Sequence, residues 1–334
     1  MNILVSGGAG YIGSVMTRQL LNVGHTVNVY DNLSTGHADS VDPRAVLVKG
    51  DLSDQNKLAA ELRNHHTDAV MHFAGVISMA ESMENPGKYF QINTGNSRNL
   101  LEAMREEHVG FIIFSSTAGV YGDPEKLPIP EDHPYRPTNP YGESKLMVEQ
   151  ILAWYDRIFD MKYLSLRYFN AAGASLDGKL GEQHPDETHL IPLAIKSARD
   201  NTPLTLFGDD YPTPDGTCVR DYIHVEDLCR AHLLALDSLA NNKKSAIYNV
   251  GTGTGHSNKE VLSEIERVSG KKINVHTAKR RPGDASELVA DASKIKNELG
   301  WKPEYSDLDT IVKTAWDFHQ SHQPSHALRL YVSS

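Results

Sequence analysis

The chain opens with NILVSGGAGYIGS, residues 2–14, and the rest of the fold can be worked out from this stretch. An apolar run at residues 3–5 predicts a strand, and a helical pattern begins at Tyr11 and continues to Asn22. Between them stand Gly7, Gly10 and Gly13, and Gly8 completes a G-x-G-x-x-G pattern. Glycines in this context allow a tight turn, close approach of a pyrophosphate, and packing of the helix on the strand. A bare turn is the alternative interpretation.

An acidic residue at the end of the next apolar run favours a dinucleotide over a bare turn. The run TVNVYD, residues 26–31, ends at Asp31, at about the separation expected for a carboxylate that binds an adenosine ribose. A carboxylate at this position repels a 2'-phosphate, so the sequence favours NAD over NADP. By the same geometry, Asp51 and Leu52 border the adenine, and Phe73, Ala74 and Gly75 pass beside the cofactor.

Short Val- and Ile-rich runs alternate with helical patterns through the first half of the chain. Each run is apolar throughout, which is typical of parallel strands buried on both faces. We therefore expect an α/β fold: a doubly wound parallel sheet over residues 1–170, with segments near 219–250 returning to it. Loops rich in Gly, Pro and Asp follow residue 170, and we expect a smaller α/β substrate-binding domain at 171–320 and a tail at 321–334.

Bulk composition argues against several classes of partner. The 334 residues carry a net charge of −10 without basic runs, which disfavours nucleic acids and anionic membranes. The two cysteines are too few for a disulfide framework, and no apolar run approaches the roughly 20 residues of a membrane helix. No signal peptide is recognisable, and we expect a cytoplasmic protein.

Residues 139–145, NPYGESK, place a tyrosine and a lysine on one face of a predicted helix. For Tyr141 to act as a base near pH 7, its pKa must fall by about three pH units from about 10. The ammonium of Lys145 and a nicotinamide cation could each supply part of this change. Thr117 ends the strand that precedes this helix, at the edge of the sheet where ligands bind. The alternatives are a surface pair for Tyr141 and Lys145, and a turn-forming hydroxyl for Thr117.

Seven motifs together resemble, in order and spacing, the extended short-chain dehydrogenase/reductase family, and within it the UDP-glucose/UDP-galactose 4-epimerases. These are SGGAGYIG, DNLSTG, HFAG, SSTAGVYG, NPYGESK, RYFNAAGA and VRDYIHVEDL, and the resemblance extends to about residue 320. It implies a catalytic triad of Thr117, Tyr141 and Lys145. By this resemblance, Tyr141 takes the proton of the sugar 4-hydroxyl while hydride passes to NAD, and the 4-keto sugar turns over before the hydride returns.

The same resemblance implies two sets of binding residues. Implied NAD contacts are Gly7, Gly10, Tyr11, Ile12, Gly13, Asp31, Asn32, Asp51, Leu52, Phe73, Ala74, Gly75, Asn93, Ser115, Tyr141, Lys145 and Tyr168. Implied contacts with the UDP-sugar are Thr117, Tyr141, Asn170, His189, Leu190, Phe207, Arg220, Tyr222, Arg281, Asp284 and Leu288. It also implies a homodimer through helices near 88–107 and 142–158.

Comparison within the family separates the possible reactions. Sugar-nucleotide dehydratases follow the threonine with an Asp-Glu pair, whereas this chain has Ala118 and Gly119, so an elimination has no acid in this loop. Alternatives that remain are a 4-epimerase of UDP-N-acetylhexosamines or of UDP-xylose/arabinose, another NAD-dependent nucleotide-sugar enzyme, and an NAD-sensing scaffold without activity.

Three positions depart from the family pattern. Ile77 replaces a lysine that reaches the nicotinamide ribose, and His189 replaces an asparagine near the uridine diphosphate. Leu288 lies where a tyrosine excludes N-acetylhexosamines and a small residue admits them, so this position leaves the sugar open.

The 16 histidines show no H-E-x-x-H motif or other paired ligand spacing, and we expect no metal. A second glycine-rich stretch, GTGTG at 251–255, has no acid-ended strand after it, so we interpret it as a turn before a helix.

Overall fold

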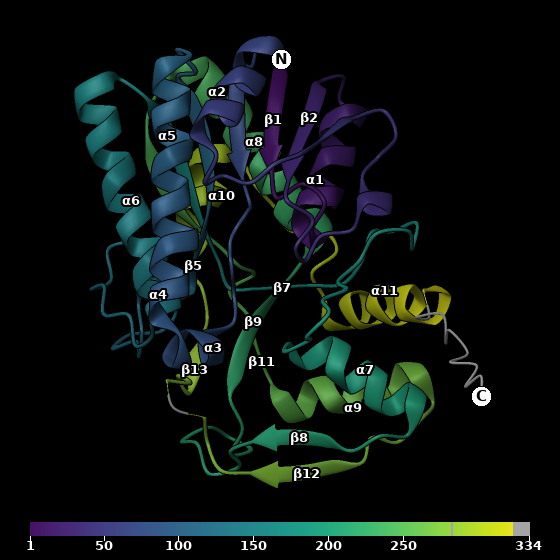
Figure 1. The fold of residues 1–334 in the computed structure, drawn as a ribbon. Helices are drawn as coiled ribbons and strands as arrows, with labels where there is room; N and C mark the ends of the chain where they lie inside the picture. Colours follow the sequence, from purple (N-terminus) through teal and green to yellow (C-terminus); the bar gives the residue numbers. More distant parts are fainter. Residues whose placement is uncertain (282, 323–334) are drawn as a thin grey trace, which may run out of the picture.

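The computed structural model describes residues 1–281 and 283–322, and a seven-stranded parallel sheet is its centre (Figure 1). The strand order is β10-β6-β5-β4-β1-β2-β3. The bounds are β1 Asn2–Ser6, β2 Thr26–Asp31, β3 Val46–Lys49, β4 Ala69–His72, β5 Phe111–Thr117, β6 Lys162–Tyr168 and β10 Ala246–Val250. The order reverses between β1 and β4, so the predicted doubly wound parallel sheet is confirmed.

Helices cover both faces of this sheet because its strands are apolar on both sides. One face packs against side chains of α1, α8 and α10, and the other against α2, α5 and α6. The bounds are α1 Tyr11–Asn22, α2 Gln55–Asn64, α5 Asn96–Glu106, α6 Pro140–Phe159, α8 Val225–Asn242 and α10 Ser293–Leu299. A short pair of helices, α3 (Met79–Glu84) and α4 (Pro86–Tyr89), and a π-helical turn at Phe90–Gly95 lead into α5.

A smaller unit lies below the main sheet in Figure 1. Its helices α7 (Leu190–Asp200), α9 (Asn258–Ser269) and α11 (Leu308–Ser321) share one apolar cluster. Two strands, β8 (Leu204–Phe207) and β12 (Val275–Ala278), pair in parallel beside these helices. A further sheet joins β9 (Val219–His224) to β7 (Asn170–Ala172), β11 (Gly255–Ser257) and β13 (Glu287–Leu288).

The returning segments behave differently from one another. Strand β10 joins the main sheet beside β6, as expected, and α8 packs on that sheet. Strand β9 does not join it, because it pairs with β7, β11 and β13 instead. The expectation that residues 219–224 return to the main sheet is therefore wrong. The helices α7 and α11 were not anticipated from the sequence, and most of the predicted tail, residues 323–334, lies outside the described part of the chain.

Because the strands are parallel, their carboxyl ends meet at one edge. Along this edge stand Tyr168 at the end of β6, Thr117 at the end of β5, the segment after β4, the glycine loop after β1, and Asp31 at the end of β2. This order sets the triad residues at one end of the edge and Asp31 at the other. Among the described residues, no helix is both long and apolar enough to cross a membrane.

Candidate active site

The glycine loop is shaped by close backbone contacts. A Cβ on Gly7 would lie 2.5 Å from the backbone nitrogen of Ala74, and one on Gly13 would lie 2.2 Å from the carbonyl oxygen of Gly7. Gly7 also has a φ of +75°, which disfavours any other residue. A Cβ on Gly10, by contrast, would meet nothing closer than the Gly7 oxygen at 3.4 Å. Gly7 and Gly13 are therefore required by packing, whereas Gly10 keeps the space at the start of α1 open.

Asp31 ties the glycine loop to the end of β2. Its buried carboxylate accepts hydrogen bonds from the backbone nitrogens of Ala9 at 3.0 Å and Leu33 at 2.8 Å. Nearby, the side-chain amide of Asn32 donates to Asp51 Oδ2 at 2.7 Å. The residues predicted to bind the adenosine thus form one connected group. Leu52, which follows Asp51 after the end of β3, is buried.

Helix α6 begins in a way that fixes the position of Tyr141. Asn139 caps the helix, because its Oδ1 accepts from the backbone nitrogen of Gly142 at 2.9 Å, and Pro140 occupies the first turn. Tyr141 therefore lies in the first turn, and the next turn places Lys145 on the same face. The ring of Tyr89 packs edge-on against Tyr141, with ring centroids 6.5 Å apart.

Thr117 is the last residue of β5, and Lys145 contacts the same strand through Ser115. Burial raises the pKa of the Tyr141 phenol above its usual value, and a hydrogen bond with Thr117 offsets part of that rise. The ammonium of Lys145 donates to the carbonyl oxygen of Ser115 at 3.0 Å and is 5.0 Å from the ring centroid of Phe114. Burial lowers the pKa of Lys145 to about 8, so it still carries its charge at pH 7.

Other predicted cofactor residues form the walls around this group. The side-chain oxygen Oδ1 of Asn93 accepts from the backbone nitrogen of Val76 at 2.9 Å, and its side-chain nitrogen Nδ2 donates to Ser144 Oγ at 3.0 Å. Asn93 therefore holds the segment that contains Gly75, whose added Cβ would lie 3.5 Å from Lys145 Nζ. Tyr168 is buried, and its hydroxyl forms a hydrogen bond with Nε2 of His232. The ring of Phe73 packs on the His232 ring, with centroids 4.9 Å apart.

The helix-side residues of the glycine loop also have partners of their own. The hydroxyl of Tyr11 donates to the carbonyl oxygen of Gly173 at 2.7 Å, and Ile12 packs against the core that covers α1. These contacts join the loop to the segment that follows β7.

Four of the predicted substrate residues lie on β7, β9 and β13. Asn170 faces Tyr222 across the β7–β9 pair, and Leu288 faces Arg220 across the β13–β9 pair. Leu288 also packs on a cluster that includes Ala118, the residue after Thr117. The structure therefore brings the position predicted to limit the sugar pocket to the triad loop.

A second group of predicted substrate residues comes from the smaller unit. The guanidinium of Arg281 lies 4.9 Å from the ring centroid of Phe207, and its Nε donates to Asp284 at 3.1 Å. Leu190 begins α7 and His189 precedes it as the capping residue. The Nδ1 atom of His189 contacts Glu182 and Glu187, so this ring is already engaged by carboxylates of its own loop.

Two polar clusters were missed by sequence reasoning. Arg167 and Glu149 form a fully buried ion pair beneath Ser116, and nothing in their 18-residue separation indicates this contact. Glu182, His184, Glu187 and His189 also come together, although no metal-ligand pattern was recognised. Their signal was the spacing E-x-H-x-x-E-x-H, which lies in a loop and not on a helix.

The GTGTG stretch is a turn, as the sequence predicted. The backbone nitrogens of Thr252 and Gly253 donate to the carboxylate of Asp221 at 2.8 and 2.9 Å. This loop therefore binds a protein carboxylate, and β11 and α9 follow it.

The residues at the sheet edge fit NAD. The space kept open at Gly10, the α1 N-terminus behind it and the buried Asp31 at the end of β2 suit a pyrophosphate and a ribose respectively. Lys145 and Tyr141 stand at the other end of the edge, where a nicotinamide would reach.

Comparison with known proteins points the same way. The family model for the NAD dependent epimerase/dehydratase family matches residues 3–251. A UDP-glucose 4-epimerase of Lactobacillus helveticus is 49% identical over 323 residues, which is 96% of this chain and 98% of that protein. The crystal structure of UDP-glucose 4-epimerase from Brucella ovis in complex with NAD is similar, with a TM-score of 0.92 and 46% identity over 94% of this chain and 97% of that one.

A third relative broadens the range of substrates among similar proteins. The UDP-Glc/GlcNAc 4-epimerase of Campylobacter jejuni has a TM-score of 0.83 and 45% identity, covering 96% of this chain and 99% of that one. Because the family model covers most of the chain and these relatives match it almost from end to end, the chain belongs to the NAD dependent epimerase/dehydratase family.

Proposed function

We propose that this chain is an NAD-dependent UDP-glucose 4-epimerase, which interconverts UDP-glucose and UDP-galactose. The observation that carries the proposal is the convergence of Thr117, Tyr141 and Lys145 at the sheet edge, next to a loop in which Ala118 and Gly119 carry no acid. This arrangement can remove a proton from a hydroxyl and return it, and it has no group in that loop for an elimination.

Each triad residue has a separate task. Tyr141 accepts the proton of the sugar 4-hydroxyl, and Thr117 holds the phenol and the hydroxyl in line through its side-chain oxygen. Lys145, charged at pH 7, favours the phenolate by its positive charge. Bound NAD supplies the hydride acceptor beside the same carbon. Tyr141 keeps the proton while the 4-keto sugar turns over, and returns it to the 4-oxygen when the other epimer forms.

The UDP portion is held on the opposite side of the site. Arg220 and Arg281 can each offer parallel N–H donors to a pyrophosphate, and Phe207, beside Arg281, offers a ring for the uracil. Asn170, Tyr222, Leu190 and Asp284 complete the proposed contacts. On this basis the smaller unit, which lies within residues 171–320, is the UDP-sugar side. Residues 1–170, with α8, β10 and α10 that return to the main sheet, are the NAD side.

The decisive experiment follows the sugar itself. Purified protein is incubated with UDP-galactose, without added reductant, and the anomeric protons are monitored by NMR. We expect UDP-glucose to accumulate to equilibrium. The variant Tyr141→Phe should lose a factor on the order of 10²–10⁴ in turnover, because general acid–base catalysis contributes about that much.

Retained NAD distinguishes chemistry from folding in this experiment. Tyr141→Phe should release the same amount of NAD on denaturation as the unmodified chain, because the glycine loop is unchanged. A chain that binds NAD but leaves UDP-galactose untouched would instead be a cofactor-sensing scaffold. A chain that releases no NAD would direct attention to Ile77, which is 40% exposed and has no charge to offer the cofactor.

A second candidate substrate is UDP-N-acetylglucosamine. The Campylobacter jejuni relative is described as acting on both sugars, and Leu288 is smaller than the tyrosine that excludes the N-acetyl group. Leu288→Tyr should abolish turnover of the N-acetyl sugar and keep that of UDP-galactose. If the variant epimerises both sugars as before, Leu288 does not limit the pocket.

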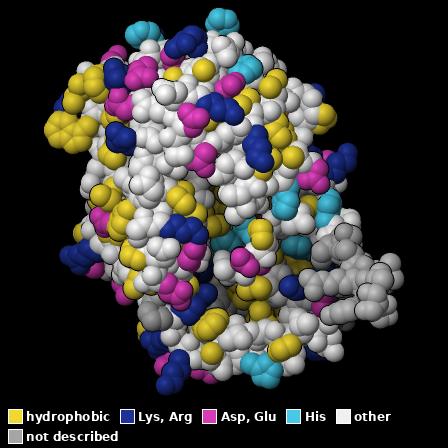
Figure 2. Space-filling model, in the orientation of Figure 1, with side chains coloured by type: hydrophobic (Ala, Val, Ile, Leu, Met, Phe, Trp, Pro, Cys, Tyr) yellow, Lys and Arg dark blue, Asp and Glu magenta, His cyan; other side chains and the backbone are white. Residues whose placement is uncertain are grey.

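We also propose a homodimer through the helices near 88–107 and 142–158. Helix α6 leaves Met147, Trp154, Ile158 and Phe159 at 38–61% exposure, and Figure 2 shows hydrophobic side chains gathered over α6 at its upper left. Exposed apolar groups clustered in this way mark an interaction surface. Sedimentation should give twice the chain mass, and Trp154→Glu should shift the equilibrium toward monomer. A chain that sediments as a monomer at all concentrations would exclude this interface.

A further inference from the structure

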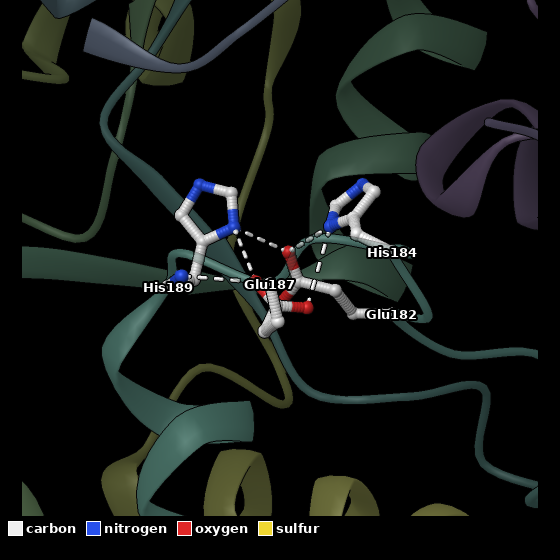
Figure 3. Close-up of side chains that lie close together, drawn as sticks. All are labelled: Glu182, His184, Glu187 and His189. Atoms are coloured by element: carbon white, nitrogen blue, oxygen red, sulfur yellow. Dashed lines mark hydrogen bonds and ion pairs between the residues drawn. The ribbon is translucent and has the colours of Figure 1, made fainter. Parts of the chain in front are cut away.

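The loop between β7 and α7 carries four side chains that could hold a metal ion. Glu182, His184, Glu187 and His189 are spaced E-x-H-x-x-E-x-H and contribute one ligand atom each, all within 4.8 Å of one another. Figure 3 shows the two imidazoles on either side of the carboxylates, each with its Nδ1 turned toward them. This cluster is separate from the triad, although His189 is also one of the residues that the family resemblance implies in UDP-sugar binding.

Several distances between imidazole nitrogens and carboxylate oxygens are close to those of a tetrahedral metal site. His189 Nδ1 is 3.3 Å from Glu187 Oε1, and His184 Nδ1 is 3.4 Å from both Glu182 Oε1 and Glu187 Oε2. A tetrahedron with metal–ligand bonds of about 2.0 Å has edges of about 3.3 Å. One further pair, His189 Nδ1 and Glu182 Oε1, is at 2.6 Å and would need to open by less than about 1 Å. The two Glu187 distances go to different oxygens of its carboxylate, so this side chain would also need to turn to offer one oxygen to the ion.

The burial of two carboxylates also requires positive charge beside them. The side chain of Glu182 is 8% exposed and that of Glu187 is 15% exposed, so two carboxylates lie largely out of water. Buried charge is unfavourable unless it is paired. Without a metal, the imidazoles must supply the positive charge that these carboxylates need. A divalent cation held by neutral imidazoles would supply the same two positive charges.

We propose that this cluster binds a Zn²⁺ ion through Nδ1 of His184 and His189 and one carboxylate oxygen each of Glu182 and Glu187. Two imidazoles and two carboxylates in a tetrahedral arrangement suit Zn²⁺, whereas Mg²⁺ and Ca²⁺ prefer six or more oxygen ligands. Four protein ligands leave no open position for a reacting water. The site is therefore structural, and its effect is on the loop that contains it.

The position of the loop indicates what the ion would stabilise. The neighbouring carbonyl oxygen of Gln183 lies 3.2 Å from Nε2 of His37, which follows the end of β2. His184 also lines a small cavity of about 30 Å³ with Gly10 and Tyr11 of the glycine loop. His189 caps α7. An ion bound here would connect the start of α7 to residues 182–184, which lie next to the glycine loop between β1 and α1.

The test measures metal binding by the full-length chain. Protein stripped with a chelator and dialysed is titrated with Zn²⁺ alone by calorimetry, and bound zinc is counted by mass spectrometry. We expect about one Zn²⁺ per chain and a higher melting temperature in its presence. Co²⁺ added to the same stripped protein should give the intense visible absorption of a tetrahedral site. Because the readout is metal binding, it stands apart from the outcome with UDP-galactose.

A matched pair of variants locates the site. His184→Gln removes one ligand and should weaken Zn²⁺ binding by on the order of 100-fold or more. His65→Gln is the control, because His65 pairs with Glu61 on the surface of α2 at 3.2 Å and belongs to no such cluster. Binding as tight in His184→Gln as in the unmodified chain would overturn the proposal. If that variant fails to fold, the Co²⁺ spectrum of the unmodified chain decides. An octahedral spectrum, or no uptake of either metal, would overturn the proposal and identify the cluster as an ion-pair network only.

Discussion

Arg167 has no solvent exposure, yet it carries a full charge beneath the end of β5. Its guanidinium donates to both carboxylate oxygens of Glu149, at 2.9 and 2.6 Å, and to the hydroxyl of Tyr121 at 2.7 Å. Ser116, next to Thr117, donates to the same carboxylate at 2.5 Å. Burial alone would lower the pKa of Arg167, but the hydrogen bonds and charge of Glu149 outweigh it, so the pKa is raised. This pair holds β5, β6 and α6 together behind the triad.

Removing one partner of this pair should be far more damaging than removing both. Arg167→Met leaves Glu149 charged and buried, and we expect the free energy of unfolding to fall by about 3–5 kcal/mol. The double variant Arg167→Met with Glu149→Leu should recover most of that loss, because no buried charge remains. Urea denaturation of the three proteins measures both effects. Equal losses in the single and double variants would mean that packing, and not charge, dominates at this position.

At the scale of elements, the turn from β1 to α1 combines two requirements in one glycine pattern. The contacts of Gly7 and Gly13 are with backbone atoms, which cannot move aside as a flexible side chain can. The surroundings of Gly10 are open on the side that faces the sheet edge. The same motif therefore contains glycines needed for the fold and one available to a ligand.

Two alanine substitutions should separate these requirements. Gly13→Ala places a Cβ against the Gly7 carbonyl oxygen and should destabilise the chain by about 1–3 kcal/mol or more. Gly10→Ala should leave the melting temperature almost unchanged but lower the NAD content by about tenfold or more, since about 1.4 kcal/mol of lost binding gives that factor. Thermal unfolding of chelator-treated, NAD-free protein measures the effect of each variant on stability. Quantification of the NAD released from the proteins as purified measures its effect on cofactor binding. A Gly10→Ala protein with full NAD content would refute the proposed path of the pyrophosphate.

At the scale of the whole molecule, three buried histidines link stability to pH. Burial lowers the pKa of His72 to about 3 and those of His224 and His232 to about 4. The charge of Lys145 lowers the pKa of His72 further, whereas Asp227 and Asp307 act in the opposite direction on His224. All three are held neutral in the folded chain by their surroundings.

Acid should therefore destabilise the protein through these residues. Below about pH 6.5 these histidines bind protons in the unfolded chain but not in the folded chain. Each one therefore lowers the free energy of unfolding by about 1.4 kcal/mol per pH unit as the pH falls toward about 4. Urea midpoints at pH 7, 6 and 5 measure this slope. His232→Gln should reduce it by about one proton, whereas His276→Gln, on the exposed strand β12, should not change it. An identical slope in both variants would show that His232 is not the group that titrates.

Much of the fold followed from local pattern. Helix α1 has the bounds that the sequence predicted, and α6 starts at Pro140, one residue before the predicted start. The NPYGESK segment placed its tyrosine and lysine correctly, because a capping asparagine, a proline and a four-residue spacing act within one turn of a helix. The glycine loop was predictable for a similar reason, because its strand, glycines and helix follow one another directly in the sequence.

Contacts between segments distant in the sequence were not predictable in this way. Strand β9 was expected to return to the main sheet, but it pairs with β7, β11 and β13, which lie 30 to 70 residues away in the sequence. Asp221 takes the backbone nitrogens of the GTGTG turn, 31 and 32 residues along the chain. Which distant groups meet depends on loop closure and on the total surface buried, and neither is encoded in a short motif.

The sequence by itself therefore determined the parallel sheet, the glycine loop with its acidic partner and the Tyr141–Lys145 pair, since each depends on neighbours within a few residues or on a strand's apolar character. Only the tertiary structure decided the buried Arg167–Glu149 pair and the meeting of Glu182, His184, Glu187 and His189. Burial brings them together, because a charge removed from water needs a partner and the fold determines which partner is within reach.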